Sequence, residues 1–363
     1  MNNASPAPPK SRNSRFIPFF LSLVVAIAIG FTIRHFKGKP YATTEGQAWE
    51  VYFSEVNGAS QAFSLERRLV AKLGLATERI DAALYDLDSK LIADALIDAR
   101  DRGINVRVFT EHDNISDKNE GKESEMVRLQ KAGVPVRDDK GNDGYMHHKF
   151  IVIDERYVWT GSYNTTYNGA YKNNNNVVWI DSEPLAYNFT QEFREMYILA
   201  QLDRTADPHI PFPHITLNDG TQISTYFAPE NDTISPLLKE IKSAEKSIYF
   251  MAFAFTHDKL GKTMRDRYKR GVLVEGVFDR SQNQKDKYSE YEPMKKEGLS
   301  VRMNNNSGKM HHKVIVIDEE TVITGSYNFS KRAEEQNSEN LLIIKGNKDI
   351  AQAYLDEFHR LKW

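Results

Sequence analysis

The longest apolar stretch of the chain lies near its N-terminus. Residues 16–33 (FIPFFLSLVVAIAIGFTI) contain no charged side chain, and residues 1–15 before them are polar and basic. A helix of this length rises about 27 Å, which is close to the thickness of the hydrocarbon core of a bilayer. The run is apolar on every face, whereas a helix on the surface of a globular protein keeps a polar face. The pattern therefore predicts a transmembrane helix over residues 16–33.

The residues after this run favour an anchor that is not cleaved. Signal cleavage requires small residues directly after the apolar run, but the sequence RHFK follows. We therefore expect a single-pass membrane protein in which a linker over residues 34–46 follows the anchor. Basic residues flank the run on both sides, so the charge rule gives no firm orientation. Of the two orientations, we favour the one that places the larger part of the chain outside the cytoplasm.

Beyond the linker, short apolar runs alternate with amphipathic stretches, and their order occurs twice. Each half has an apolar run suited to a buried strand, then apolar residues at helical spacing, then a glycine suited to a helix C-cap. This alternation predicts an α/β fold with two pseudo-repeated domains, each a mixed sheet flanked by helices. We expect these domains over residues 47–205 and 206–363. The matching runs are 80–87 and 248–255, and the matching glycines are Gly103 and Gly271.

One 19-residue stretch occurs twice in the chain. Residues 146–164 read MHHKFIVIDERYVWTGSYN and residues 310–328 read MHHKVIVIDEETVITGSYN, with 15 of 19 positions identical. Each copy has the form His-x-Lys, four residues, Asp, six residues and Gly-Ser-x-Asn. The copies lie 164 residues apart, which indicates two similar structural units in one polypeptide.

The repeated side chains suit the cleavage of a phosphodiester. Residues two apart on a strand point to the same face, so His147 and Lys149 face one cleft. The same spacing brings His311 and Lys313 together. Two imidazoles can supply the nucleophile and the acid for the leaving oxygen, and two ammonium groups can offset the phosphate charge. Further hydrogen bonds to the phosphate oxygens are expected from Ser162, Asn164, Ser326 and Asn328.

This combination of motifs resembles the phospholipase D superfamily, whose mark is His-x-Lys-x4-Asp followed by Gly-Ser-x-Asn. The resemblance covers both motifs, and the flanking elements extend it over residues 49–363. It implies a bilobal phosphodiesterase with one active site at the interface of its halves. It also implies a covalent phosphohistidine intermediate and no need for a metal or another cofactor. A monomer would then suffice for one active site.

The two halves differ at an acidic position downstream of the motif. The second copy is followed by NSEN, whose acidic residue is Glu339, whereas the first is followed by NNNN, with Asn175 in that place. In the family such a carboxylate backs a histidine of the opposite half, which implies that Glu339 pairs with His147. A carboxylate partner orients an imidazole and stabilises its cationic form. On that argument His147 is the nucleophile and His311 the general acid.

Four further motif residues are expected to have supporting roles. Asp154 and Asp318 open the turn after the apolar strand, where a carboxylate fixes the local backbone. His148 and His312 point away from their reactive neighbours, because adjacent strand residues face opposite sides. We expect these two histidines to pack or to form structural hydrogen bonds. No Glu or Cys completes a zinc-binding pattern with them, so no metal site is expected.

Composition narrows the classes of protein that fit. The chain of 363 residues has room for two domains, and it lacks cysteine, which excludes disulfides, thiolate zinc sites and cysteine nucleophiles. Its first 40 residues hold six Lys and Arg and no acidic residue, which leaves 42 basic against 50 acidic residues beyond them. Proteins that bind nucleic acids often carry a basic surplus instead. This balance weighs against a nucleic-acid substrate, although a basic cleft on an acidic body would still allow one.

The leading interpretation is a membrane-anchored phosphodiesterase that hydrolyses phospholipid or single-stranded nucleic acid, with neither substrate clearly preferred. The size of the halves resembles the small nuclease and cardiolipin-hydrolase branch of the superfamily. A phosphatidyltransferase of the cardiolipin synthase type is the alternative within the family, although such enzymes usually have more than one transmembrane segment. A non-catalytic anchored binding protein is the alternative of a different class. Intact motifs in both halves argue against it.

Overall fold

The computed structural model describes residue 1 and residues 48–56, 61–115, 123–202 and 206–362. The predicted transmembrane helix over residues 16–33, with the basic segment and linker beside it, lies outside these residues. Within the described ranges, no helix is long and apolar enough to cross a bilayer. The two predicted α/β halves are described almost completely.

The first half contains one mixed seven-stranded sheet with the strand order β1-β7-β6-β5-β2-β3-β4. Strands β2, β3 and β4 are parallel, whereas the motif strand β5 runs antiparallel to β2. The strands are β1 (Trp49–Phe53), β2 (Arg79–Leu84), β3 (Asn105–Thr110), β4 (Val136–Asp138), β5 (Lys149–Ile153), β6 (Tyr157–Gly161) and β7 (Asn176–Asp181). The helices are η1 (Gln61–Phe63), α2 (Leu65–Leu73), α3 (Lys90–Asp101), η2 (His112–Asn114), α4 (Glu125–Lys131), α5 (Tyr167–Tyr171), α6 (Glu183–Arg194) and η3 (Glu195–Leu199).

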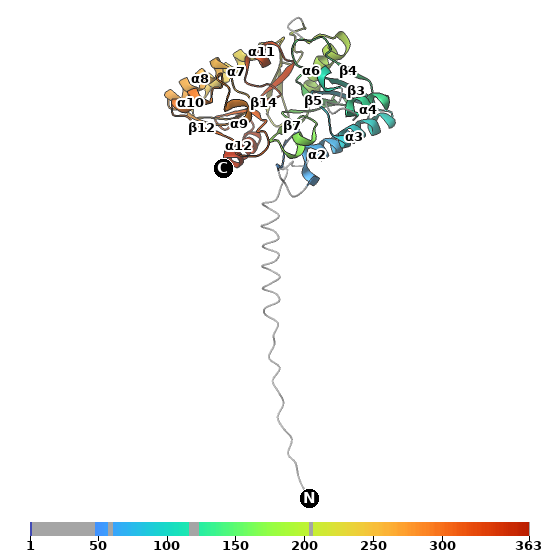
Figure 1. Cartoon of the computed structure of the whole chain (residues 1–363), viewed down its shortest axis with the longest axis horizontal. Helices are drawn as coiled ribbons and strands as arrows, with labels where there is room; N and C mark the ends of the chain where they lie inside the picture. Colours follow the sequence, from blue (N-terminus) through green and yellow to red (C-terminus); the bar gives the residue numbers. More distant parts are fainter. Residues whose placement is uncertain (2–47, 57–60, 116–122, 203–205, 363) are drawn as a thin grey trace. The chain divides into compact units, whose positions relative to one another are not determined.

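The second half repeats this plan and adds one edge strand, with the order β12-β11-β10-β13-β14-β15-β9-β8. Helices α7 to α12 mark this half in Figure 1. The predicted α/β fold with a mixed sheet in each half is therefore confirmed. The strands are β8 (His214–Thr216), β9 (Gln222–Ala228), β10 (Ser247–Ala252), β11 (Leu273–Phe278), β12 (Ser300–Met303), β13 (Lys313–Ile317), β14 (Thr321–Gly325) and β15 (Glu339–Lys345). The helices are α7 (Ile234–Ser243), α8 (Asp258–Lys269), α9 (Arg280–Asn283), α10 (Tyr291–Lys296), α11 (Lys331–Glu335) and α12 (Lys348–Lys362).

The glycines expected at helix ends have the conformation that this position requires. Gly103 follows α3 with a φ of 91°, and Gly271 follows α8 with a φ of 90°. Backbones in this left-handed region favour glycine because it lacks a Cβ atom. The two matching apolar runs form shorter strands than expected. The run over residues 80–87 leaves its sheet after Leu84, and the run over residues 248–255 leaves its sheet after Ala252.

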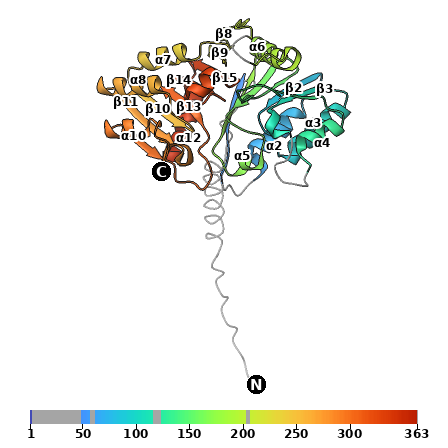
Figure 2. The same cartoon turned by 45° about the horizontal axis from the view of Figure 1, so that its top comes forward.

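The two sheets share one hydrophobic core. Helix α6 packs on strands of its own sheet and on β9 of the second half, beside which it lies in Figure 2. Helix α12 packs on its own sheet and on β1 of the first half. Aromatic pairs cross the boundary in both directions. Phe189 of α6 meets Phe227 with ring centroids 5.2 Å apart, and Tyr354 of α12 meets Phe53 at 5.3 Å. Because both halves bury apolar side chains in this shared layer, the hydrophobic effect holds them together.

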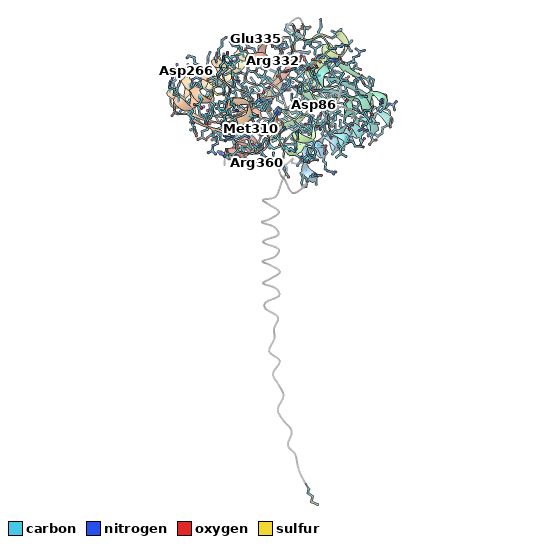
Figure 3. The ribbon with its side chains drawn as sticks, viewed as in Figure 1. Asp86, Asp266, Met310, Arg332, Glu335 and Arg360 are labelled. Atoms are coloured by element: carbon cyan, nitrogen blue, oxygen red, sulfur yellow. The ribbon has the colours of Figure 1, made fainter. Side chains whose placement is uncertain are left out.

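The halves also exchange backbone hydrogen bonds at the motif. The His147 amide donates to the Ser338 carbonyl at 3.0 Å, and the His311 amide donates to the Asn174 carbonyl at 2.9 Å. Met310, which is next to His311 and is labelled in Figure 3, forms an isolated β-bridge with Asn174. Each histidine-bearing segment is thus held by the other half.

Two equivalent glycines permit this close approach. A Cβ on Gly144 would lie 1.8 Å from the Gln336 carbonyl oxygen, and one on Gly308 would lie 1.7 Å from the Lys172 carbonyl oxygen. Both contacts cross between the halves and involve backbone atoms, which cannot move aside as a side chain tip can. Glycine is therefore required at both positions for a steric reason.

We expect Gly308→Ala to lower the free energy of unfolding by about 1–3 kcal/mol or more, because the added methyl group overlaps a backbone carbonyl of the other half. Urea unfolding of the full chain in detergent, followed by tryptophan fluorescence, measures this change. Gly74→Ala is the matched control, since Gly74 has a helical φ of −64° and its nearest added contact is 3.3 Å. Equal stability of the two variants would contradict the proposed close approach.

Candidate active site

The structure brings both His-Lys pairs into one buried cluster between the halves. The imidazoles of His147 and His311 are 8% and 6% exposed, and Lys149 and Lys313 are 3% and 1% exposed. Each histidine lies two residues before its lysine, and the lysine is the first residue of the motif strand. Both imidazoles interact electrostatically with the lysines of both halves. The four side chains therefore lie in one cluster.

Burial controls the charge of this cluster. It lowers the pKa of Lys149 to about 7, and burial together with the positive charge of Lys149 lowers the pKa of Lys313 well below its ordinary value. Burial, followed by the two ammonium groups, also lowers the pKa values of His147 and His311 well below the ordinary value. Repulsion between like charges and loss of hydration act in the same direction. An anion between the lysines would relieve both effects.

The lysines are oriented by contacts that repeat in each half. Lys149 donates from Nζ to the carbonyl oxygen of His147 at 2.6 Å, and Lys313 makes the equivalent bond to His311 at 2.9 Å. The ammonium groups also lie over aromatic rings, 4.8 Å from the Tyr85 centroid and 4.7 Å from the Phe253 centroid. Cation–π contact of this kind stabilises a charge that has lost its water.

Tyr85 and Phe253 also touch the imidazoles edge-on. The ring centroids are 4.9 Å apart for Tyr85 and His147 and 4.5 Å apart for Phe253 and His311. The sequence analysis missed these two aromatic residues. Their equivalent positions, directly after β2 and β10, are the signal that would have found them.

The two imidazoles have different partners. Nδ1 of His147 lies 2.8 Å from Oε2 of Glu339, so the expected contact between them is confirmed. Nδ1 of His311 lies 2.9 Å from Oδ1 of Asn175 and 3.0 Å from the carbonyl oxygen of Ser162. The partners of His311 are acceptors, so its Nδ1 carries the proton and its Nε2 keeps a lone pair. An ionised Glu339, which also accepts from Ser326, gives His147 the same tautomer. Asn175 thus makes the same contact with Nδ1 of His311 that Glu339 makes with Nδ1 of His147.

The serine hydroxyls are occupied by these partner residues. Ser326 donates from Oγ to Oε2 of Glu339 at 2.6 Å, and Ser162 donates to Oδ1 of Asn175 at 2.9 Å. Each hydroxyl hydrogen is therefore already used, and phosphate binding by the two serines stays a prediction. The equivalent asparagines differ, because the side-chain oxygens of Asn164 and Asn328 are buried and have no hydrogen-bond partner among the described residues. Their predicted contact with phosphate also stays a prediction.

The neighbouring histidines make structural hydrogen bonds, as their orientation predicted. Nε2 of His148 lies 2.8 Å from Glu192, and Nε2 of His312 lies 2.9 Å from Glu357. On the opposite side of each ring, Nδ1 accepts from an asparagine of the other half. The acceptor and donor pairs are His148 with Asn340 at 3.3 Å and His312 with Asn176 at 2.9 Å.

Asp154 and Asp318 fix the backbone beside the sheets. Asp154 accepts from the amides of Thr77, Glu78 and Arg79, at 2.8 to 2.9 Å. Asp318 accepts from the three equivalent amides, those of residues 245–247, at 2.7 to 2.8 Å. Both aspartates have a positive φ, 53° and 52°, in the tight turn that follows the motif strand. Such contacts agree with a supporting role outside the reacting centre.

Comparison with known proteins places this geometry in a family. Residues 69–197 and 237–363 match the family model described as "Cardiolipin synthase, PLD-like domain", so the matches span more than half of the chain.

Among the described residues, no group of three or more His, Cys, Asp or Glu is arranged to hold a metal ion.

Two relatives match less than half of the chain, and one solved structure matches most of it. A phospholipase D of Rickettsia bellii is 31% identical over 158 residues, which cover 44% of this chain and 78% of that protein. A mitochondrial cardiolipin hydrolase of Chlamydomonas reinhardtii is 30% identical over 130 residues, which cover 36% of this chain and 56% of that protein. The structure of a phosphatidylserine synthase of Haemophilus influenzae covers 92% of this chain and 90% of its own, with a TM-score of 0.64 and 13% identity. That likeness shows a shared fold.

We expect both His147 and His311 to be neutral at pH 7 and to carry their proton on Nδ1, because their pKa values are lowered and their Nδ1 partners are acceptors. Long-range ¹H–¹⁵N NMR spectra of the full chain labelled at histidine measure the tautomer. The variants His147→Gln and His311→Gln assign the two signals. A doubly protonated ring at pH 7 for either residue would contradict the derived charge state.

Proposed function

The chain belongs to the phospholipase D-like family of phosphodiester hydrolases, and from this premise we propose that it hydrolyses phospholipids at one site formed by both halves. The observation that carries the proposal is the cluster of two imidazoles and two ammonium groups, buried at the interface and drawn equally from each half. Such a cluster supplies a nucleophile, an acid and two positive charges to a single phosphate.

Phospholipid is favoured as the substrate by three observations. Relatives of this chain are named phospholipase D and cardiolipin hydrolase. Residues 16–33 form an apolar run that would hold the site beside a lipid surface, and the rest of the chain is acidic overall. We retain the single-pass anchor as part of the proposal, with the catalytic halves outside the cytoplasm.

In the proposed first step, Nε2 of His147 attacks phosphorus and the bond from phosphorus to the leaving oxygen breaks. Glu339 accepts the Nδ1 hydrogen bond and stabilises the positive charge that develops on the imidazole. Lys149 and Lys313 offset the charge on the phosphate oxygens. His311 donates a proton to the leaving oxygen.

The partners of His311 suit the role of acid. Asn175 is neutral, so a protonated His311 gains less stabilisation than a carboxylate would give, and it releases its proton more readily. A bound phosphate supplies the missing negative charge and raises the pKa of His311, so that the proton is present when substrate is bound. In the second step water attacks the phosphohistidine and His311 takes up a proton from that water. Attack by an alcohol in place of water would give phosphatidyl transfer.

Single-stranded nucleic acid is a second candidate substrate. The observation that favours this substrate is a pair of partly exposed aromatic rings. Tyr85 contacts His147, and Phe253 contacts His311. Bases of a single strand stack on such rings with little sequence preference.

We expect the full chain in phosphatidylglycerol-containing micelles to release the headgroup in excess EDTA, because the phosphate charge is met by lysines and not by a required metal. His147→Ala and His311→Ala should each lower turnover by about 10³ or more, since one site uses both residues. His209→Ala, which changes an exposed histidine, is the matched control. Substantial activity in either single variant would indicate two independent sites. Cleavage of a single-stranded oligonucleotide without lipid hydrolysis would favour the second candidate.

Replacing Glu339 with Gln should lower turnover by about 10² to 10⁴, because the neutral amide keeps the size but not the charge behind His147. The control Asn175→Asp adds a carboxylate behind His311 and should cost no more than about tenfold. Acid quenching during turnover of ³²P-labelled substrate should trap phosphate on His147 of the parent. Label on His311 would reverse the two roles, and label on neither residue would remove the covalent step.

A further inference from the structure

The backbone amide next to His147 is held by two carboxyl groups. The amide of Met146 lies 2.8 Å from Oε2 of Glu111 and 3.2 Å from Oδ2 of Asp139. Asp139 also accepts from the His112 amide through Oδ1 at 2.6 Å. Glu111 directly follows β3 and Asp139 directly follows β4, so two parallel strands aim their ends at one peptide group. Both side chains are buried, at 6% and 5% exposed.

The second half builds the same clamp with one carboxyl group only. Asp279 follows β11, takes the place of Glu111 and accepts from the Met310 amide at 2.8 Å. Asn304 follows β12, takes the place of Asp139 and accepts from the Arg280 amide at 2.7 Å. The carboxamide of Asn304 accepts from the Arg280 amide as Asp139 accepts from the His112 amide, but it carries no charge. Only the half that holds His147 therefore carries an acid pair.

Two buried carboxyl groups in contact do not both ionise readily. Burial, followed by the charge of Asp139, raises the pKa of Glu111 to about 7, and burial also raises the pKa of Asp139. With one proton between them, one group donates to the other and both still reach the Met146 amide. Without that proton the two negative charges repel each other. The titratable groups that face the pair are Tyr85, His112, Asp113, Asp138 and Lys149.

We propose that Glu111 and Asp139 are positioning residues for His147, which share one proton and hold the Met146 amide so that the imidazole stays aligned. The proposal rests on the assignment of His147 as the nucleophile. Neither carboxyl group touches the reacting atoms, and the shared proton is not transferred to substrate. When the pair loses this proton, repulsion loosens the segment that carries His147, and the reaction slows above neutral pH.

The half that lacks the pair supplies the design of the test. Glu111→Gln keeps an acceptor for Met146 and a donor for Asp139, so it imitates the protonated pair at every pH. Asp139→Asn copies Asn304 and leaves a single carboxylate, which provides a second variant should the first fail to fold. Asn304→Asp is the reciprocal change and creates a second acid pair beside Asp279.

The first measurement is the pH dependence of kcat/KM for phosphatidylglycerol hydrolysis by the full chain. In the parent, the alkaline decline should begin at least about 0.5 pH units lower than in Glu111→Gln or Asp139→Asn. Asn304→Asp should move the decline in the opposite direction, to lower pH than in the parent. A merely structural role would lower activity equally at all pH values. Profiles of parent and variants that coincide would overturn the proposal.

The second measurement does not need activity. Because the folded pKa of Glu111 is raised, the folded state binds an extra proton between pH 4.5 and about 7, so the free energy of unfolding falls as pH rises through this window. The melting temperature of the parent should therefore fall by a few degrees more than that of Glu111→Gln between pH 5 and 8. If the melting temperatures of the parent and Glu111→Gln depended equally on pH, the two carboxyl groups would not share a proton. A parent inactive on every phosphodiester would instead overturn the proposed function. The melting data would still decide whether Glu111 and Asp139 share a proton.

Discussion

The reciprocal hold of each half on the other's histidine segment is the constraint on which the site depends. The amides of His147 and His311 are satisfied by carbonyl groups of the opposite half, and Gly144 and Gly308 leave just enough room for that approach. A backbone amide without its partner in this buried position would cost free energy. Neither half can therefore present its imidazole in this geometry alone. Assembly of the shared core and formation of the site are the same event.

The cluster at this interface buries two lysines together. Among the residues that the structure describes, Glu339 is the one carboxylate that directly contacts the imidazole of His147 or His311. Burial raises the pKa of Glu339 to about 7 and lowers that of Lys149 to a similar value, so neither charge is strongly fixed without a ligand. Under the proposed function, a bound phosphodiester supplies negative charge between the two lysines and offsets the repulsion between them, which favours binding of a compact anion.

Small chemical differences break the symmetry between the two halves. Glu339 contacts His147, whereas its counterpart Asn175 contacts His311. Two carboxyl groups hold the Met146 amide, whereas Asp279 alone holds the equivalent Met310 amide and Asn304 takes the place of Asp139. The two imidazoles therefore have unequal surroundings. Under the proposed function, this inequality suits His147 to hold phosphate and His311 to release a proton.

Local sequence patterns by themselves determined the fold class and the central residues of the site. The repeat, the alternation of apolar strands and amphipathic helices, and the His-x-Lys spacing identified the α/β halves and the four central side chains. The apolar run over residues 16–33 likewise rests on local hydropathy alone. These features are readable because periodicity and residue type act over a few neighbouring positions.

Only the tertiary structure decided which side chains complete the site. The contact between His147 and Glu339 joins residues 192 positions apart. The family resemblance anticipated that contact, but nothing in the sequence placed Asn175 and the Ser162 carbonyl at His311. The sequence also did not reveal that the serine hydroxyls donate to Glu339 and Asn175, or that Glu111 and Asp139 both accept from the Met146 amide. Such contacts follow from the ends of separate strands converging across an interface, and no local pattern records that convergence.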